Sequence, residues 1–129
     1  MYPSEYLYSR EHEWVRVEED VCTVGVTHFA QEELGEVVFV ELPEVGQTFD
    51  ATEEIGTIES VKAVAELYTP VAGEVVEVNR AAIEDPAIVN EDPHGEGWLV
   101  KLRFSTDSDL KQLMSAEQYE VFVQSGEAE

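Results

Sequence analysis

The strongest constraint on the fold is the stretch from Glu54 to Val78, which holds two apolar, β-branched runs around a short tip and a third run after a turn. The tip reads Ser60-Val61-Lys62-Ala63, and Pro70 and Gly73 mark the second turn. Runs of this length, separated by turn residues, are typical of antiparallel strands. The pattern therefore predicts a hairpin of strands 53–59 and 64–68 that carries Lys62 into solvent, and a further strand at 74–78.

The remaining chain shows the same alternation of short β-forming runs and turn signals. Alternating apolar and polar residues predict strands at 14–18, 21–26, 36–42 and 98–104. Capping residues predict helices at 28–34 (Thr27 cap, ended by Gly35), at 80–84 (Asn79 cap), around 110–114 (Asp107 cap), and from Ser115 to near Gly126.

Loops and two glycines complete the prediction. Residues 90–97 are rich in glycine, proline and acids and are expected to form a loop, and 125–129 to be a frayed tail. Gly56 is expected at a bulge or close backbone approach, and Gly73 in a turn with positive φ.

Many short strands joined by proline- and glycine-bearing turns point to a small β-sandwich or flattened barrel. The 129 residues fit one domain, 1–129, and a chain of this size buries roughly two-thirds of its extended surface. The fold class expected is therefore mainly β, with two antiparallel sheets, a few short peripheral helices and a C-terminal helix.

The charge balance limits the partners, because seven basic against 29 acidic residues give a net charge of −22. Such a field repels nucleic acid and anionic membrane surfaces and favours partners with basic patches. Cys22 is the only cysteine, so no internal disulfide can form. Residues 1–8 have neither the basic nor the apolar segment of a signal peptide, and a cytoplasmic location is expected.

No catalytic arrangement is recognisable in the sequence. Nucleophile elbows, glycine-rich phosphate loops and zinc-type cysteine patterns are missing, and His12, His28 and His94 do not have the spacing of metal ligands. We expect neither a catalytic site nor a metal site. Lys62 at a hairpin tip then has two explanations: it solvates the turn, or it is the attachment point of a cofactor.

A family resemblance favours the second explanation. The segments that carry it cover almost the whole chain in order: His12-Glu13-Trp14-Val15, Val24 to Pro43, Glu59-Ser60-Val61-Lys62-Ala63, Gly73 to Asn79, and Val89 to Trp98. They resemble the glycine cleavage system H protein family. His94, where this family usually has tyrosine, and the large acidic excess are departures. Neither departure concerns the segment around Lys62.

The resemblance implies a lipoyl/biotinyl carrier fold with lipoate attached covalently to Lys62. Val61 and Ala63 disfavour the biotin carriers, which typically have methionine at both positions, and Val61 disfavours acyltransferase lipoyl domains, which typically have aspartate there. The resemblance also implies that the lipoylating enzyme recognises Glu59, Val61 and Ala63.

By the same resemblance, the protein is a carrier and not an enzyme. It would take the aminomethyl group of glycine from glycine decarboxylase to aminomethyltransferase, and dihydrolipoamide dehydrogenase would reoxidise the arm. The free carrier is expected to be a monomer. Two alternatives stay open: an unlipoylated interaction module that uses the same hairpin for docking, and a protein that relays lipoyl groups to other enzymes.

A carrier of an ammonium-bearing group benefits from a surface groove that excludes water and offers a carboxylate. Glu66 lies four residues beyond Lys62, and Glu13 lies beside Trp14, which could form an apolar wall. The sequence thus suggests that Glu13 and Glu66 share one shallow groove beside the hairpin, with Trp14 in its wall.

Overall fold

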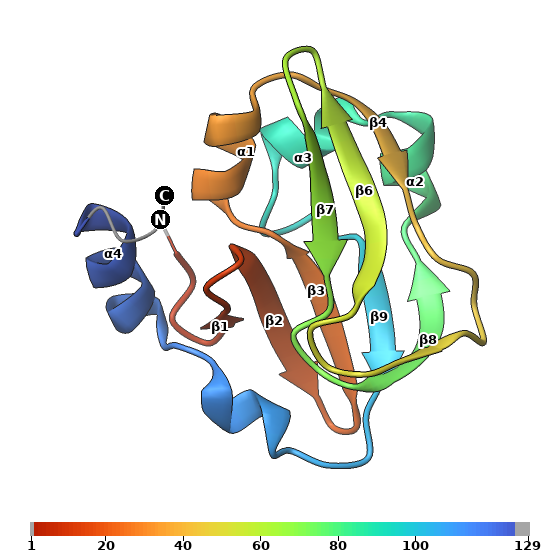
Figure 1. The fold of residues 1–129 in the computed structure, drawn as a ribbon, viewed down its shortest axis with the longest axis vertical. Coiled ribbons are helices and arrows are strands. Elements are labelled where there is room, and N and C mark those ends of the chain that lie inside the picture. The colour runs from red at the N-terminus through yellow and green to blue at the C-terminus, as the bar shows by residue number, and fades with distance from the viewer. Residues whose placement is uncertain (1, 126–129) are drawn as a thin grey trace.

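Two antiparallel sheets share one apolar core in the computed structural model, which describes residues 2–125 (Figure 1). The strands are β1 Leu7–Tyr8, β2 Glu13–Glu18, β3 Val21–Val26, β4 Val37–Glu41, β5 Thr48–Phe49, β6 Glu54–Ser60, β7 Val64–Tyr68, β8 Gly73–Val78 and β9 Val100–Arg103. The helices are α1 His28–Leu34, α2 Arg80–Glu84, α3 Ala87–Glu91, a 3-10 helix η1 Asp109–Gln112, and α4 Ala116–Gln124. The mainly β, two-sheet architecture with a C-terminal helix is as predicted.

The larger sheet has the strand order β1-β2-β3-β9-β8-β5, and the smaller has the order β4-β6-β7. Alternate residues of both sheets point inward, so that Val24 and Val100 of the larger sheet join Val40, Ile58 and Leu67 of the smaller one in the core. Because both sheets bury their inner faces in the same cluster, the hairpin that bears Lys62 stands on a fixed base.

That hairpin is the one predicted, with β6 and β7 paired from Glu59↔Val64 to Glu54↔Tyr68, and its turn projects at the top of Figure 1 beside α1. The register shifts next to Gly56, where a Cβ atom would collide with the carbonyl oxygen of Glu41. The close approach expected at Gly56 is therefore confirmed.

The expectation of a positive φ at Gly73 is wrong. Gly73 is the first residue of β8, and among the described glycines only Gly35 and Gly46 have positive φ. Its lack of a side chain has another cause: a Cβ atom there would lie 2.5 Å from the Arg103 carbonyl oxygen. The strand it begins leaves the hairpin sheet and pairs with β9 and β5 instead.

Three of the four predicted helix caps are confirmed. The Thr27 and Asn79 side chains accept hydrogen bonds from Ala30 N and Ala81 N, and Ser115 forms the full capping box with Gln118. The Asp107 cap is wrong, because η1 begins at Asp109, which instead accepts a hydrogen bond from Ala72 N through its carboxylate.

Three short elements, β1, β5 and α3, were not predicted. The loop expected at 90–97 begins later, because Asn90 and Glu91 end α3. Helix α4 ends at Gln124, and residues 126–129 of the expected tail lie outside the described residues. Within residues 2–125, no helix is long and apolar enough to cross a membrane.

Candidate functional site

The tip of the β6–β7 hairpin presents Lys62 to solvent in a turn organised by Ser60. The Ser60 hydroxyl donates to Ala63 O at 3.2 Å and accepts from Lys62 N at 3.3 Å and Ala63 N at 3.1 Å. Val61, Lys62 and Ala63 are all exposed. The turn is thus ordered by its own hydrogen bonds, while the side chain of Lys62 stays accessible.

The tip is also anchored to the corner between α1 and β4. Val61 N donates to Glu36 O at 3.0 Å, and the Lys62 side chain lies against Gly35, its Cε 3.5 Å from the position that a Gly35 Cβ would take. Gly35 has φ +78°, a conformation that glycine adopts without strain. The corner therefore fixes where the Lys62 side chain begins.

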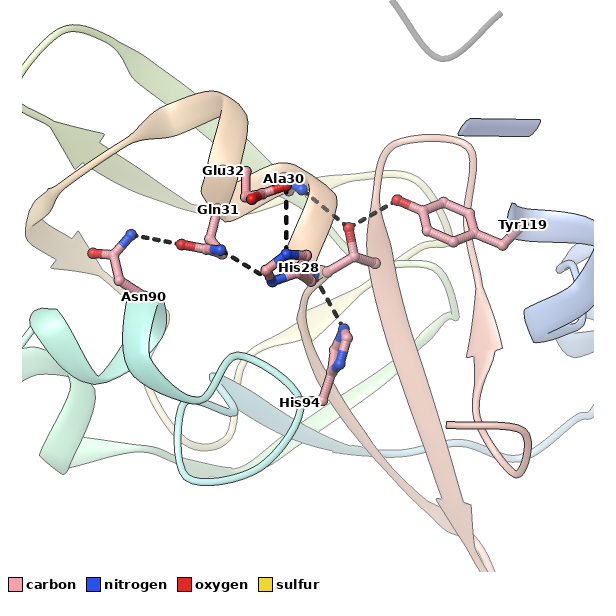
Figure 2. Close-up of polar contacts among 8 residues, drawn as sticks. His28, Ala30, Gln31, Glu32, Asn90, His94 and Tyr119 are labelled. Carbon is pink, nitrogen blue, oxygen red and sulfur yellow. Dashed lines mark hydrogen bonds and ion pairs between the residues drawn. The ribbon is translucent and has the colours of Figure 1, made fainter. Parts of the chain in front are cut away.

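Asn90 of α3 holds that corner in place. Its amide nitrogen donates to Gln31 Oε1 at 2.9 Å and to Gly35 O at 2.8 Å, and its Oδ1 accepts from Val37 N at 2.9 Å. Figure 2 shows the chain of contacts from Asn90 through Gln31 to His28. The sequence predicts a loop at Asn90, and this role was not predicted. Only its presence in the family-like segment 89–98 singled it out.

A groove of about 430 Å³ starts beside this corner and runs along α1, the start of β2 and the strand β7. Its walls are apolar, and its carboxylates come from four separate positions. The apolar residues are Val26, Phe29, Ala30, Leu34, Ile58 and Ala65, and the acids are Glu11, Glu13, Glu33 and Glu66. The structure thus brings Glu13 and Glu66 into one groove and adds Glu11 and Glu33, which sequence reasoning missed.

Glu13 is the buried acid of the groove, with only 2% of its surface exposed. Ser9 Oγ donates to its Oε1 at 2.6 Å, and Tyr68 N donates to its Oε2 at 3.3 Å. Burial raises the pKa of Glu13 to about 7, and the two hydrogen bonds act against that rise. Glu13 can therefore change its charge near neutral pH when a cation approaches.

His12, the neighbour of Glu13, forms part of the groove wall and has a left-handed backbone with φ 70°. Its Nδ1 lies 2.7 Å from the hydroxyl of Tyr119 on α4, which lies 2.8 Å from Thr27 Oγ1. Figure 2 shows Tyr119 reaching the cap of α1. The C-terminal helix thus joins His12 and the start of α1, which both belong to the groove lining or its cap.

Trp14 lies elsewhere than expected. It is fully buried, donates from Nε1 to Pro93 O at 2.8 Å and stacks on Tyr6, and it does not line the groove. Trp14 follows Glu13 on β2, so its side chain leaves the strand on the opposite face, against Gly25 of β3. The apolar wall comes from α1 and the hairpin instead.

Glu59 lies on the outer face of the smaller sheet, in a cross-strand row with Phe39 and Val64. All three are exposed, and a register shift at Val38 turns this neighbouring apolar residue outward as well. An apolar patch with an acid at its centre therefore adjoins the tip.

The arrangement suits a long apolar chain that starts at Lys62 and ends in a cation, because the groove offers hydrocarbon walls and carboxylates. Among residues 2–125, no group of three or more His, Cys, Asp or Glu side chains is arranged to hold a metal ion.

Comparison with known proteins gives one consistent family. Residues 6–126 match the family model described as glycine cleavage H-protein. A glycine cleavage system H protein of Rubrobacter xylanophilus is 59% identical over 117 residues, 91% of this chain and 90% of that protein. One of Herpetosiphon aurantiacus is 52% identical over 121 residues, 94% of this chain and 92% of that protein.

A solved structure agrees with these sequence relatives. The crystal structure of a glycine cleavage system H protein from Mycobacterium marinum has a TM-score of 0.86 and 39% sequence identity. The match covers 97% of this chain and 99% of that one.

Proposed function

Because the chain belongs to the glycine cleavage H-protein family, a family of carrier subunits without catalysis of their own, we propose that it carries a lipoyl group on Lys62. The observation that carries the proposal is an exposed lysine at an ordered hairpin tip, anchored beside a groove with apolar walls and acidic side chains. Its place is in the glycine cleavage system, as the carrier of the aminomethyl group of glycine.

Lys62 fits covalent attachment better than Lys101, another of the three lysines of the chain. Lys101 lies within a strand, forms an ion pair with Glu77 at 3.6 Å and lies over the ring of Trp98. Lys62 has a turn around it that an enzyme can approach from most directions. When bound, lipoate would supply a dithiolane that reacts through its sulfur atoms.

The surface around the tip supports recognition by a lipoylating enzyme. Glu59 offers a charge for a basic partner, and Val61 and Ala63 are small apolar residues on either side of Lys62. The adjoining exposed pair Phe39 and Val64 enlarges the apolar area. An enzyme surface with an apolar centre and a basic rim complements this face and the net charge of −22.

The groove is proposed as the resting place of the loaded arm. Its apolar walls exclude water from a carried ammonium group that is prone to hydrolysis, and Glu13 and Glu66 offer carboxylates to that group. A cation near Glu13 favours the ionised carboxylate, so that arm docking and loss of the Glu13 proton support each other.

The proposed cycle has glycine decarboxylase as donor, aminomethyltransferase as acceptor and dihydrolipoamide dehydrogenase for reoxidation. Residues 1–129 are proposed to form one carrier domain, which the shared core of the two sheets supports. The free carrier is proposed to be a cytoplasmic monomer, and the single buried thiol of Cys22 suits a reducing compartment.

Intact mass after incubation with a lipoylating enzyme, ATP and lipoate tests the attachment. The parent chain should gain one lipoyl increment, whereas Lys62→Arg should fold normally and gain none. Lys101→Arg is the matched control and should be lipoylated like the parent. Lipoate on Lys101 or Lys111 would refute the proposal. Glycine-dependent bicarbonate exchange with glycine decarboxylase separates a glycine carrier from a protein that only relays lipoyl groups.

The groove is tested by the rate of ammonia release from the loaded carrier. Glu13→Gln and Glu66→Gln should each release ammonia faster than the parent, because the carried ammonium loses a charged partner. Glu74→Gln removes an exposed charge outside the groove and is the matched control. Parent-like rates of ammonia release in both groove variants would contradict the proposal that the arm rests in the groove.

A further inference from the structure

We propose that Ser9 is a positioning residue, which holds the Glu13 carboxylate in the ionised form and orientation that the groove needs for a carried cation. This inference rests on the proposed role of the groove. Ser9 does not line the groove; it lines a second cavity of about 270 Å³ that also has Glu13 in its lining. Ser9 therefore acts on a group in the groove only through Glu13, which lines both spaces.

The hydrogen bonds of Ser9 give its hydroxyl one direction. Glu13 N donates to Ser9 Oγ at 3.0 Å, and Ser9 Oγ donates to Glu13 Oε1 at 2.6 Å. The 2.6 Å distance is that of a hydroxyl bound to a carboxylate. Since a hydroxyl has only one proton, the bond from Glu13 N leaves that proton for the carboxylate.

The backbone holds Ser9 in place for this task. Ser9 N donates to Glu13 O at 2.9 Å, and His12 N donates to Ser9 O at 3.1 Å, so that the turn between β1 and β2 is closed around the side-chain contact. Ser9 and Glu13 are both buried. Water cannot readily replace the hydroxyl, and its loss leaves the Glu13 Oε1 without this donor.

The second oxygen of Glu13 accepts from Tyr68 N at 3.3 Å, so that both oxygens of the carboxylate receive a donor. Two donors favour the ionised form against the effect of burial, which raises the pKa of Glu13. Of the two, Ser9 lowers the pKa more strongly than Tyr68 N. Ser9 is thus the side chain that keeps Glu13 available as an anion near neutral pH.

Other titratable groups lie around Glu13 and also influence its titration. Those that line the groove are Glu11, His12, Glu33 and Glu66, those that line the second cavity include Arg10, Tyr68 and Asp109, and Tyr119 of α4 also interacts electrostatically with Glu13. Substitution of Ser9 leaves all of them in place. A change confined to the titration of Glu13 can therefore be attributed to the lost hydroxyl.

The first test needs no lipoyl group. The side-chain carboxyl of Glu13 is titrated by ¹³C NMR in the unloaded parent, Ser9→Ala and Ser9→Thr. We expect Ser9→Ala to raise the midpoint by about one pH unit, and Ser9→Thr, which keeps the hydroxyl, to restore it. Ser4→Ala is the matched control, because Ser4 donates to Glu5 at 3.3 Å on the exposed surface. An unchanged midpoint in Ser9→Ala would overturn the proposal.

The second test follows ammonia release from the loaded carrier between pH 6 and pH 9.5. Ser9→Ala should release up to about fivefold faster than the parent near pH 8, where Glu13 is mostly ionised in the parent and half neutral in the variant. The two rates should converge at pH 9.5, where Glu13 is ionised in both. A factor that is the same at every pH indicates a structural effect only and would refute the role. If Ser9→Ala does not fold, Ser9→Cys, a weaker donor, must show a shift in the same direction.

The two proposals fail in different ways. A pH-independent Ser9→Ala effect beside fast release from Glu13→Gln would overturn the role of Ser9 alone. Parent-like release from Glu13→Gln would overturn the groove proposal and the role of Ser9 with it.

Discussion

Glu13→Gln should make the protein more stable at alkaline pH, because a charge that the fold buries is removed. Burial raises the pKa of Glu13 from its ordinary value of 4.5 to about 7. A carboxyl with a higher pKa in the folded chain binds its proton more tightly there, so the contribution of Glu13 to stability is complete below pH 4.5 and is lost as the pH rises through 7.

The magnitude follows from the size of that rise. A rise from 4.5 to about 7 corresponds to about 3 kcal/mol of unfolding free energy at roughly 1.4 kcal/mol per unit. Glutamine has nearly the same shape but carries no charge, and its imperfect hydrogen bonds with Ser9 and Tyr68 N cost about 1 kcal/mol at every pH. We therefore expect Glu13→Gln to be slightly less stable than the parent near pH 4.5 and about 2 kcal/mol more stable near pH 8.

Urea unfolding of both proteins at intervals from pH 4.5 to pH 8.5 measures this difference. The other titrating groups are common to the two chains, so the difference between their unfolding free energies isolates position 13. Glu11→Gln removes an exposed carboxylate from the same segment and is the matched control for the loss of a carboxylate there. A difference between Glu13→Gln and the parent that stays constant across this range would refute the reasoning.

Three further predictions concern the scaffold around the site. Gly73→Val should lower the unfolding free energy by more than about 1 kcal/mol in urea, because its Cβ would lie 2.5 Å from the Arg103 carbonyl oxygen; an unchanged midpoint would contradict this close contact. Asn90→Ala should speed amide hydrogen exchange at Val37, which loses its acceptor, and parent-like exchange there would show that Asn90 does not hold the corner. Ser115→Ala should cost about 1 kcal/mol in thermal unfolding by removing the capping box, and no loss would mean that α4 does not depend on its cap.

The elements that could be predicted are those whose signals are local. The hairpin around Lys62 and the caps Thr27, Asn79 and Ser115 depend on residues a few positions apart, and the structure has them as expected. The shared groove of Glu13 and Glu66 could be predicted for another reason. Glu66 lies on the hairpin, and Glu13 lies in a segment that resembles the family.

The misses depend on contacts between distant parts of the chain. Strands β1 and β5 are two residues long and exist because β2 and β8 pair with them. The Asp109 carboxylate accepts a hydrogen bond from Ala72 N, and the Asn90 amide nitrogen donates one to Gly35 O in the α1–β4 corner. Trp14 was placed in the groove because it adjoins Glu13, although adjacent strand residues point to opposite faces.

Because β3 pairs with β9, the larger sheet can form fully only once the C-terminal strand has been made. Thr23 pairs with Lys101, and the hydroxyl of Tyr119 lies within hydrogen-bond distance of Thr27 and His12, so the C-terminal part of the chain supports β3 and α1, which line the groove. A chain emerging from the ribosome holds its first strands long before their partners, because synthesis proceeds from the N-terminus. These elements can therefore reach their full set of contacts only after almost the whole chain has been translated, so a partner that needs the folded groove can act only on a nearly complete chain.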